Sequence, residues 1–129
     1  MIYLSAPYSF GNSRLATVQF KAVTEFAATL ITENVFSEVT YIHAFREATK
    51  DLAENLFQED YWKRVLRSIQ KNADRAIMYQ LPGWQKDPRF NQLYKLFQSW
   101  DTPVTVQAPL ARHLCSPYKE IWENAKYFS

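Results

Sequence analysis

The chain has 129 residues, of which 47% are hydrophobic and 22% charged, a composition typical of one soluble domain that can bury its own core. Two glycines exclude a glycine-rich phosphate loop, and one cysteine with two distant histidines excludes an internal disulfide and a cysteine-cluster zinc site. The net charge of +2 is too small to indicate nucleic acid, although residues 60–119 carry 10 basic and 4 acidic groups, a net +6. No apolar run reaches the length of a membrane span, and the first residues do not resemble a signal peptide, so we expect a cytoplasmic protein with no membrane partner.

The predicted elements begin with a short buried strand over Ile2–Leu4, which ends at a Ser-Ala-Pro sequence. A helix is predicted from an N-cap at Ser13 to residue 33, followed by Asn34 in the left-handed conformation that ends many helices. Residues 35–42 alternate in polarity and are rich in β-branched side chains, which predicts a strand. The buried stripe of the first helix is predicted to consist of Ala16, Phe20, Val23, Ala27 and Leu30.

The later elements are a weak helix or irregular segment at 44–57, a helix at 58–72, a strand at 76–81, a helix to residue 99, a strand at 103–108 and a helix at 117–127. Asp87 and Pro88 mark the start of the helix to residue 99, because Asp is a good N-cap and proline suits the first helical position. This alternation predicts a single α/β domain over residues 1–129, with a parallel sheet covered by helices on both faces.

Parallel sheets of this kind bind ligands beyond the carboxyl ends of their strands, near a reversal in strand order. The segments in that position are Ala6–Arg14, Thr40–Ala44, Pro82–Arg89 and Gln107–Leu110. They hold aromatic, hydroxyl, guanidinium and carboxylate groups, which suit a sugar, a base and a phosphate. The candidate ligand-binding residues are Tyr8, Arg14, His43, Trp84 and Arg89, and a candidate catalytic carboxylate is Asp87. Structural alternatives remain open: the aromatic rings cover the core, the histidine is a hydrogen-bonded core residue, and the aspartate is a helix N-cap.

Several segments, in chain order, resemble the nucleoside 2-deoxyribosyltransferase-like proteins, particularly the short, often phage-encoded members of unknown function. IYLSAPYS followed by Arg14 resembles their IYLASPYS…R opening, and VFSEVTYIHA resembles a second strand usually written VFSPI with a following histidine, here His43. DYWKRVLRSIQKNADRAIMYQLPGW resembles a D…W…L…CD stretch that runs into a strand and LPGW. The matching residues in that stretch are Asp60, Trp62, Asp74 and Trp84. With PVTVQA as the following strand, the resemblance covers residues 1–108.

The resemblance implies a flavodoxin-like or Rossmann-like fold. It also implies an enzyme that cleaves or transfers the N-glycosidic bond of a 2′-deoxynucleoside or nucleoside 5′-monophosphate, with no metal or organic cofactor. In that chemistry a carboxylate attacks the anomeric carbon, and water or a second base resolves the covalent glycosyl-enzyme. Active members usually carry S-x-G-x-x-x-E after the third strand, with the glutamate as nucleophile. Here Asp87 stands near the serine, Arg89 near the glycine, and Gln92 or Leu93 in the place of the glutamate.

Two functions therefore remain open. The first is an enzyme that acts on a nucleoside 5′-monophosphate, with Tyr8 and Trp84 around the base or sugar, Arg14 and Arg89 on the phosphate, and Asp87, Asp60 or Glu38 as the carboxylate. The second is a catalytically inactive member that binds a nucleotide or a protein partner. Nucleic acid is not favoured as a partner, because the basic helix 63–71 has no exposed aromatics interleaved with its charges. The resemblance also implies a homodimer or larger homo-oligomer. The C-terminal segment lies outside the resemblance, and its aromatics are candidates for such an interface.

Overall fold

The computed structural model describes the backbone of residues 1–50 and 55–125 and the side chains of residues 1–50 and 62–125. In this part of the chain, four strands form one parallel sheet in the order β2-β1-β3-β4. The strands are β1 (Ile2–Ser5), β2 (Val35–Ser37), β3 (Arg75–Tyr79) and β4 (Val104–Gln107). The helices are α1 (Ser13–Ala28), α2 (Glu38–Thr49), α3 (Asn55–Lys71), α4 (Pro88–Ser99) and α5 (Tyr118–Asn124), with 3-10 turns η1 (Trp84–Lys86) and η2 (Ala111–His113).

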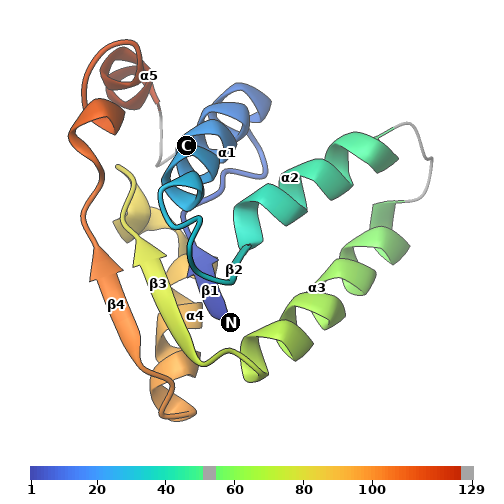
Figure 1. The fold of residues 1–129 in the computed structure, drawn as a ribbon. Coiled ribbons are helices and arrows are strands. Elements are labelled where there is room, and N and C mark those ends of the chain that lie inside the picture. Colours follow the sequence, from blue (N-terminus) through green and yellow to red (C-terminus); the bar gives the residue numbers. More distant parts are fainter. Residues whose placement is uncertain (51–54, 126–129) are drawn as a thin grey trace.

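Helices cover both faces of the sheet, and Figure 1 shows α1 in front of the strands and α4 behind them. Alternate residues of β1 point to opposite faces and therefore belong to two cores. Ile2 and Leu4 join a cluster with α1, α2, α3 and α5, whereas Tyr3 joins a second cluster with α4. The strand order corresponds to the first four strands of the flavodoxin-like order. The predicted single-domain α/β fold is confirmed.

The strand predicted over residues 35–42 is wrong beyond Ser37, because α2 begins at Glu38. Val39, Ile42 and His43 are buried at helical spacing, whereas residues 35–42 by themselves also fit the alternation of a strand. Residues 40–44, predicted to lie at the end of a strand, therefore lie within a helix. The weak element predicted at 44–57 is divided between α2 and α3, and its residues 51–54 lie outside the described part of the chain.

The boundaries of α1 also differ from the prediction. Asn12 is the N-cap instead of Ser13, because its side-chain oxygen accepts a hydrogen bond from the Leu15 N–H at 3.0 Å. The helix ends at Ala28, five residues earlier than expected, and its C-cap residue Thr29 has the backbone conformation of a right-handed helix. Asn34 does not adopt the predicted left-handed conformation, which among the described non-glycine residues occurs only at Asp101.

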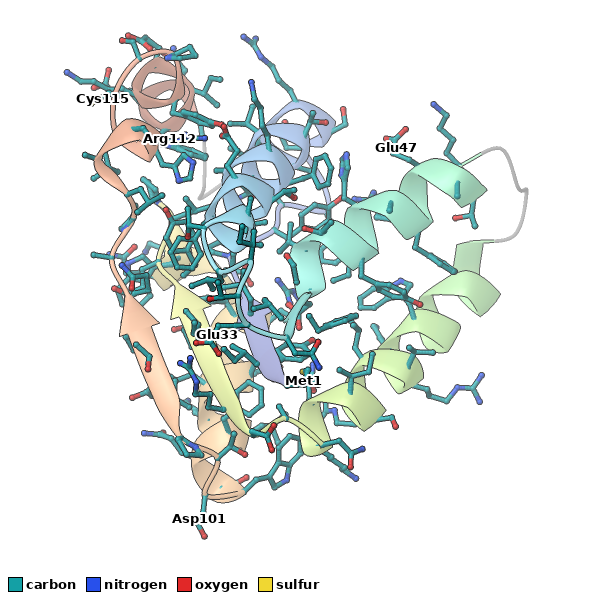
Figure 2. The ribbon with its side chains drawn as sticks, in the orientation of Figure 1. Met1, Glu33, Glu47, Asp101, Arg112 and Cys115 are labelled. Atoms are coloured by element: carbon teal, nitrogen blue, oxygen red, sulfur yellow. The ribbon has the colours of Figure 1, made fainter. Side chains whose placement is uncertain are left out.

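The C-terminal segment folds against its own chain. Tyr118 and Trp122 are buried in the core cluster that contains α1, so these predicted interface aromatics are covered within the molecule. Tyr79 Oη accepts a hydrogen bond from the Leu110 N–H at 2.8 Å and lies 2.7 Å from His113 Nδ1. Figure 2 shows the side chain of Arg112, which forms an ion pair with a glutamate of α1. No helix in the described residues has the length and apolar character needed to cross a membrane.

Candidate ligand-binding site

The loops that follow β1 and β3 meet where the strand order reverses, which is the usual ligand position in such sheets. Asp87 links the two loops: Oδ2 accepts the Tyr8 N–H at 2.9 Å, and Oδ1 accepts the Phe90 N–H at 3.0 Å. The predicted N-cap role of Asp87 is therefore confirmed, and the same side chain also fixes the β1–α1 loop. Each of its carboxylate oxygens accepts one backbone N–H.

A cavity of about 520 Å³ lies between these loops. The β1–α1 loop forms one wall and the first residues of α4 form the other, together with Gly83, whose φ of 94° favours glycine. Buried Gln19 of α1 holds the loop in place, because its Oε1 accepts the Ser9 N–H at 2.7 Å and its Nε2 donates to Ser9 Oγ at 3.1 Å. The position of the loop is thus set by polar contacts from both α1 and α4.

Tyr8 is the centre of a second group of contacts, with α2. Its ring is buried, and its hydroxyl lies 2.9 Å from His43 Nδ1 and accepts a hydrogen bond from Arg46 Nη1 at 3.2 Å. The arginine can only donate, whereas the direction of the hydrogen bond between the tyrosine hydroxyl and Nδ1 depends on the tautomer of His43. Burial lowers the pKa of His43 and raises the pKa of Tyr8, so both side chains are neutral near pH 7.

These residues line a cavity of about 410 Å³ between the β1–α1 loop, α2 and α3. Besides His43, four aromatic residues line it, Tyr8, Phe10, Phe45 and Trp62, and the rings of Phe10 and Trp62 stack with centroids 5.7 Å apart. The Arg46 guanidinium lies 5.6 Å and 5.2 Å from the centroids of the Tyr8 and Phe10 rings, and its Nη2 donates to the Phe10 carbonyl at 3.2 Å. Lys50 is a second cation on the same wall.

Glu38 at the start of α2 and Arg89 at the start of α4 form an ion pair. The carboxylate is fully buried and also accepts hydrogen bonds from the hydroxyls of Tyr3 and Ser5. Burial disfavours the charged guanidinium, but the carboxylates of Glu38 and Asp87, with Tyr3, together outweigh this effect, so the pKa of Arg89 is raised. Burial, with the adjacent carboxylate, also raises the pKa of Tyr3, which therefore remains a donor.

The ion pair forms part of the wall of a further cavity, of about 400 Å³. Gln70 of α3 is buried beside it, and its Nε2 donates to Tyr3 Oη at 3.0 Å and to a Glu38 oxygen at 3.4 Å. Phe10 and Trp62 line this cavity as well as the one at Tyr8, so the two cavities adjoin along that pair of rings. Figure 2 shows side chains of α2 and α3 occupying the space between the two helices.

A family model described as a domain of unknown function, DUF1937, matches residues 1–108. The chain belongs to the DUF1937 family. No curated protein matches it. The matched segment of the DUF1937 chain contains the whole sheet and all three cavities, whereas η2 and α5 follow it. In the described part of the DUF1937 chain, no group of three or more His, Cys, Asp or Glu side chains could hold a metal ion.

The structure brings together four of the residues predicted for the site. Tyr8 and His43 are hydrogen-bonded to each other, and Asp87 and Arg89 lie together at the start of α4. Arg14 is exposed and lines none of the three cavities. Trp84 also lines none of them and packs against Phe90. The side chain of Asp60 lies outside the described residues.

Sequence reasoning missed Phe10, Arg46 and Gln70. Arg46 follows His43 by three residues, so its position beside Tyr8 would have been evident if residues 38–49 had been recognised as a helix. Gln70 falls within the predicted helix 58–72, but an isolated glutamine carries no signal of burial. Only the packing of α3 against β1 places it in the core.

Proposed function

We propose that this DUF1937 protein binds a nucleoside 5′-monophosphate in the cavity around Tyr8. The observation that carries the proposal is the convergence of four Tyr, Phe and Trp side chains and the Arg46 guanidinium on one cavity at the end of β1. Aromatic rings stack on the face of any nucleobase, and a guanidinium binds phosphate oxygens through paired N–H donors. The contacts of Arg46 with other described residues use two of its five donors, which leaves donors for a ligand.

The charge of this cavity suits a phosphate. Arg46 and Lys50 supply two positive charges, Glu47 supplies one negative charge, and His43 is neutral. The start of α1 lies on the same wall, through Ser13, and adds the partial positive charge of a helix N-terminus. A phosphate at the Arg46 end leaves the aromatic rings for the base.

Binding without cleavage of the N-glycosidic bond is the form of the proposal that the carboxylates support. Both oxygens of Asp87 accept backbone N–H groups, and those of Glu38 accept hydrogen bonds from two hydroxyls and an amide besides the ion pair with Arg89. Hydrogen bonds to these oxygens stabilise the negative charge and make each carboxylate a weaker nucleophile. The alternative, an N-glycosidase, is favoured by one observation: Glu38 lines a cavity that adjoins the proposed base site.

Isothermal titration with nucleosides and their 5′-monophosphates tests the proposal. Monophosphates should bind, and Arg46→Met should weaken their binding by about 10- to 100-fold, the value of a charged hydrogen bond. Arg64→Met, which removes an exposed cation of α3, is the matched control and should leave binding unchanged. Arg14→Met shows whether the phosphate reaches the position predicted from the sequence. Equal effects of the Arg46 and Arg64 substitutions would contradict the proposal.

Chromatographic detection of free base separates binding from cleavage. The wild type should release no base from nucleotides that it binds. If base is released, and Glu38→Gln abolishes the release while Asp87→Asn and Asp60→Asn do not, the protein is a glycosidase with Glu38 as its carboxylate. The predicted homo-oligomer can be checked in the same preparation by light scattering with and without the nucleotide.

A further inference from the structure

Among the described residues, two that line the same cavity each carry a buried polar atom without a hydrogen-bond partner. These atoms are Gln70 Oε1, an acceptor, and Arg89 Nε, a donor, and the cavity is the one that adjoins the Phe10–Trp62 pair. Gln70 is only 6% exposed. Buried polar groups are nearly always paired, because leaving one unpaired costs the free energy of removing it from water. Two complementary orphans on one cavity wall therefore indicate a group that the cavity is built to receive.

The orientations of both side chains are set by contacts on their other sides. Arg89 directs Nη1 to Glu38 and donates from Nη2 to the Ala6 carbonyl at 2.8 Å, so Nε is left facing away from the ion pair. Gln70 directs its Nε2 to the carboxylate and to Tyr3, and turning the amide over would place Oε1 against the negative charge of Glu38. The free donor and the free acceptor are thus fixed in place before any ligand enters.

This wall selects the chemistry of what it binds. The charges of Glu38 and Arg89 cancel at this part of the wall, while Lys63 and Arg67 add positive charge elsewhere on the cavity lining. An anion could accept from Arg89 Nε, but it has no hydrogen to donate to Gln70 Oε1 and would face the buried carboxylate. A hydroxyl both donates and accepts, and it satisfies both atoms without a net charge.

We propose that Gln70 and Arg89 form a hydroxyl-binding subsite that takes the pentose hydroxyls of the ligand. The assignment rests on the proposed nucleotide-binding function, because the phosphate and base occupy the adjoining cavity at Tyr8. Phe10 and Trp62 line both cavities, so one ligand that passes beside these rings reaches both. The subsite thereby makes recognition depend on the sugar as well as on the phosphate.

Titration of a ligand series tests the subsite against the proposed function. Ribonucleoside 5′-monophosphate should bind more tightly than its 2′,3′-dideoxy counterpart, by about 10-fold or more, because the dideoxy ligand leaves both buried atoms unpaired. Gln70→Leu should reduce this difference to less than about 3-fold, whereas Gln98→Leu, on an exposed position of α4, should preserve it. Equal binding of both nucleotides by the wild type would overturn the subsite and leave the proposed function standing.

A measurement on the wild type covers the case in which Gln70→Leu does not fold or no nucleotide binds. The side-chain amide resonances of Gln70 and the Nε–H resonance of Arg89 can be followed by NMR while free ribose is added to high millimolar concentration. Both should shift with saturation, and an equivalent titration with inorganic phosphate should leave the Gln70 resonances unmoved. If ribose moves neither set of resonances, the subsite is refuted whatever the outcome with nucleotides.

Discussion

Replacing Arg89 with methionine should destabilise the fold more than any exposed substitution, because it leaves the Glu38 carboxylate buried without its counter-ion. Glu38 is 0% exposed, so water cannot replace the guanidinium. Removing one partner of a buried ion pair costs about 3–5 kcal/mol. The Ala6 carbonyl, which is also buried, loses its donor from Arg89 at the same time, which adds about 1 kcal/mol.

The opposite substitution should cost less. The Arg89 side chain is 25% exposed, and Glu38→Gln keeps an oxygen that can accept from it, so a loss of about 1–2 kcal/mol is expected. In the double variant, Glu38→Gln with Arg89→Met, no charge remains buried and the loss should be only about 2 kcal/mol. The two single losses together amount to about 5–8 kcal/mol, which exceeds the loss in the double variant and gives a coupling free energy of about 3–6 kcal/mol.

Equilibrium unfolding in urea at pH 7 measures all three variants, since a chain of this size is expected to unfold in one transition. Arg64→Met, at an exposed position of α3, is the control and should change the free energy of unfolding by less than about 0.5 kcal/mol. If the loss in the double variant equals the sum of the single losses within about 0.5 kcal/mol, the two residues do not interact and the reasoning is refuted.

Three further predictions concern stability. Asp87→Ala should lower the free energy of unfolding in urea by about 1–2 kcal/mol, because α4 loses its N-cap and the β1–α1 loop loses the hydrogen bond at Tyr8 N–H. A decrease below about 0.3 kcal/mol would contradict the capping role. Tyr79→Phe should cost about 1–3 kcal/mol, because the Leu110 N–H and His113 lose their partner, and amide exchange should accelerate in residues 109–125 but not in α4. Burial lowers the pKa of both His43 and His113, so the unfolded chain takes up protons first as the pH falls below about 6.5. The free energy of unfolding should therefore decrease from pH 7 to pH 5, less steeply in His43→Gln, and an unchanged slope would refute this assignment.

The centre of the sheet and the start of α4 could be predicted because their signals are local. The apolar run of β3 is bounded by a turn that contains Gly83, and Asp87 with Pro88 combines a capping side chain with a fixed backbone angle. Such signals act over a few residues, so no knowledge of the rest of the chain is needed to read them. The alternation of helices and strands follows from the same kind of pattern.

The start of α2 could not be predicted in the same way. Residues 35–42 satisfy the period of a strand, and their helical period becomes clear only with the residues that follow, such as Phe45 and Arg46. What decides the structure there is the position of α2 against α1, where it buries Val39 and Ile42 in the common core. The error displaced His43 from a helix to a loop and concealed Arg46.

By itself, the sequence determined the α/β order, the parallel sheet and the edge at which a ligand is expected. Only the tertiary structure decided which side chains meet there. Glu38 and Arg89 are 51 positions apart in the chain, and Tyr8 and Arg46 are 38 apart. Their contacts depend on which strands become neighbours and where each crossover helix begins, and no local periodicity carries that information. The polar groups of the site are therefore specified by burial and pairing between distant elements, which is a property of the folded chain as a whole.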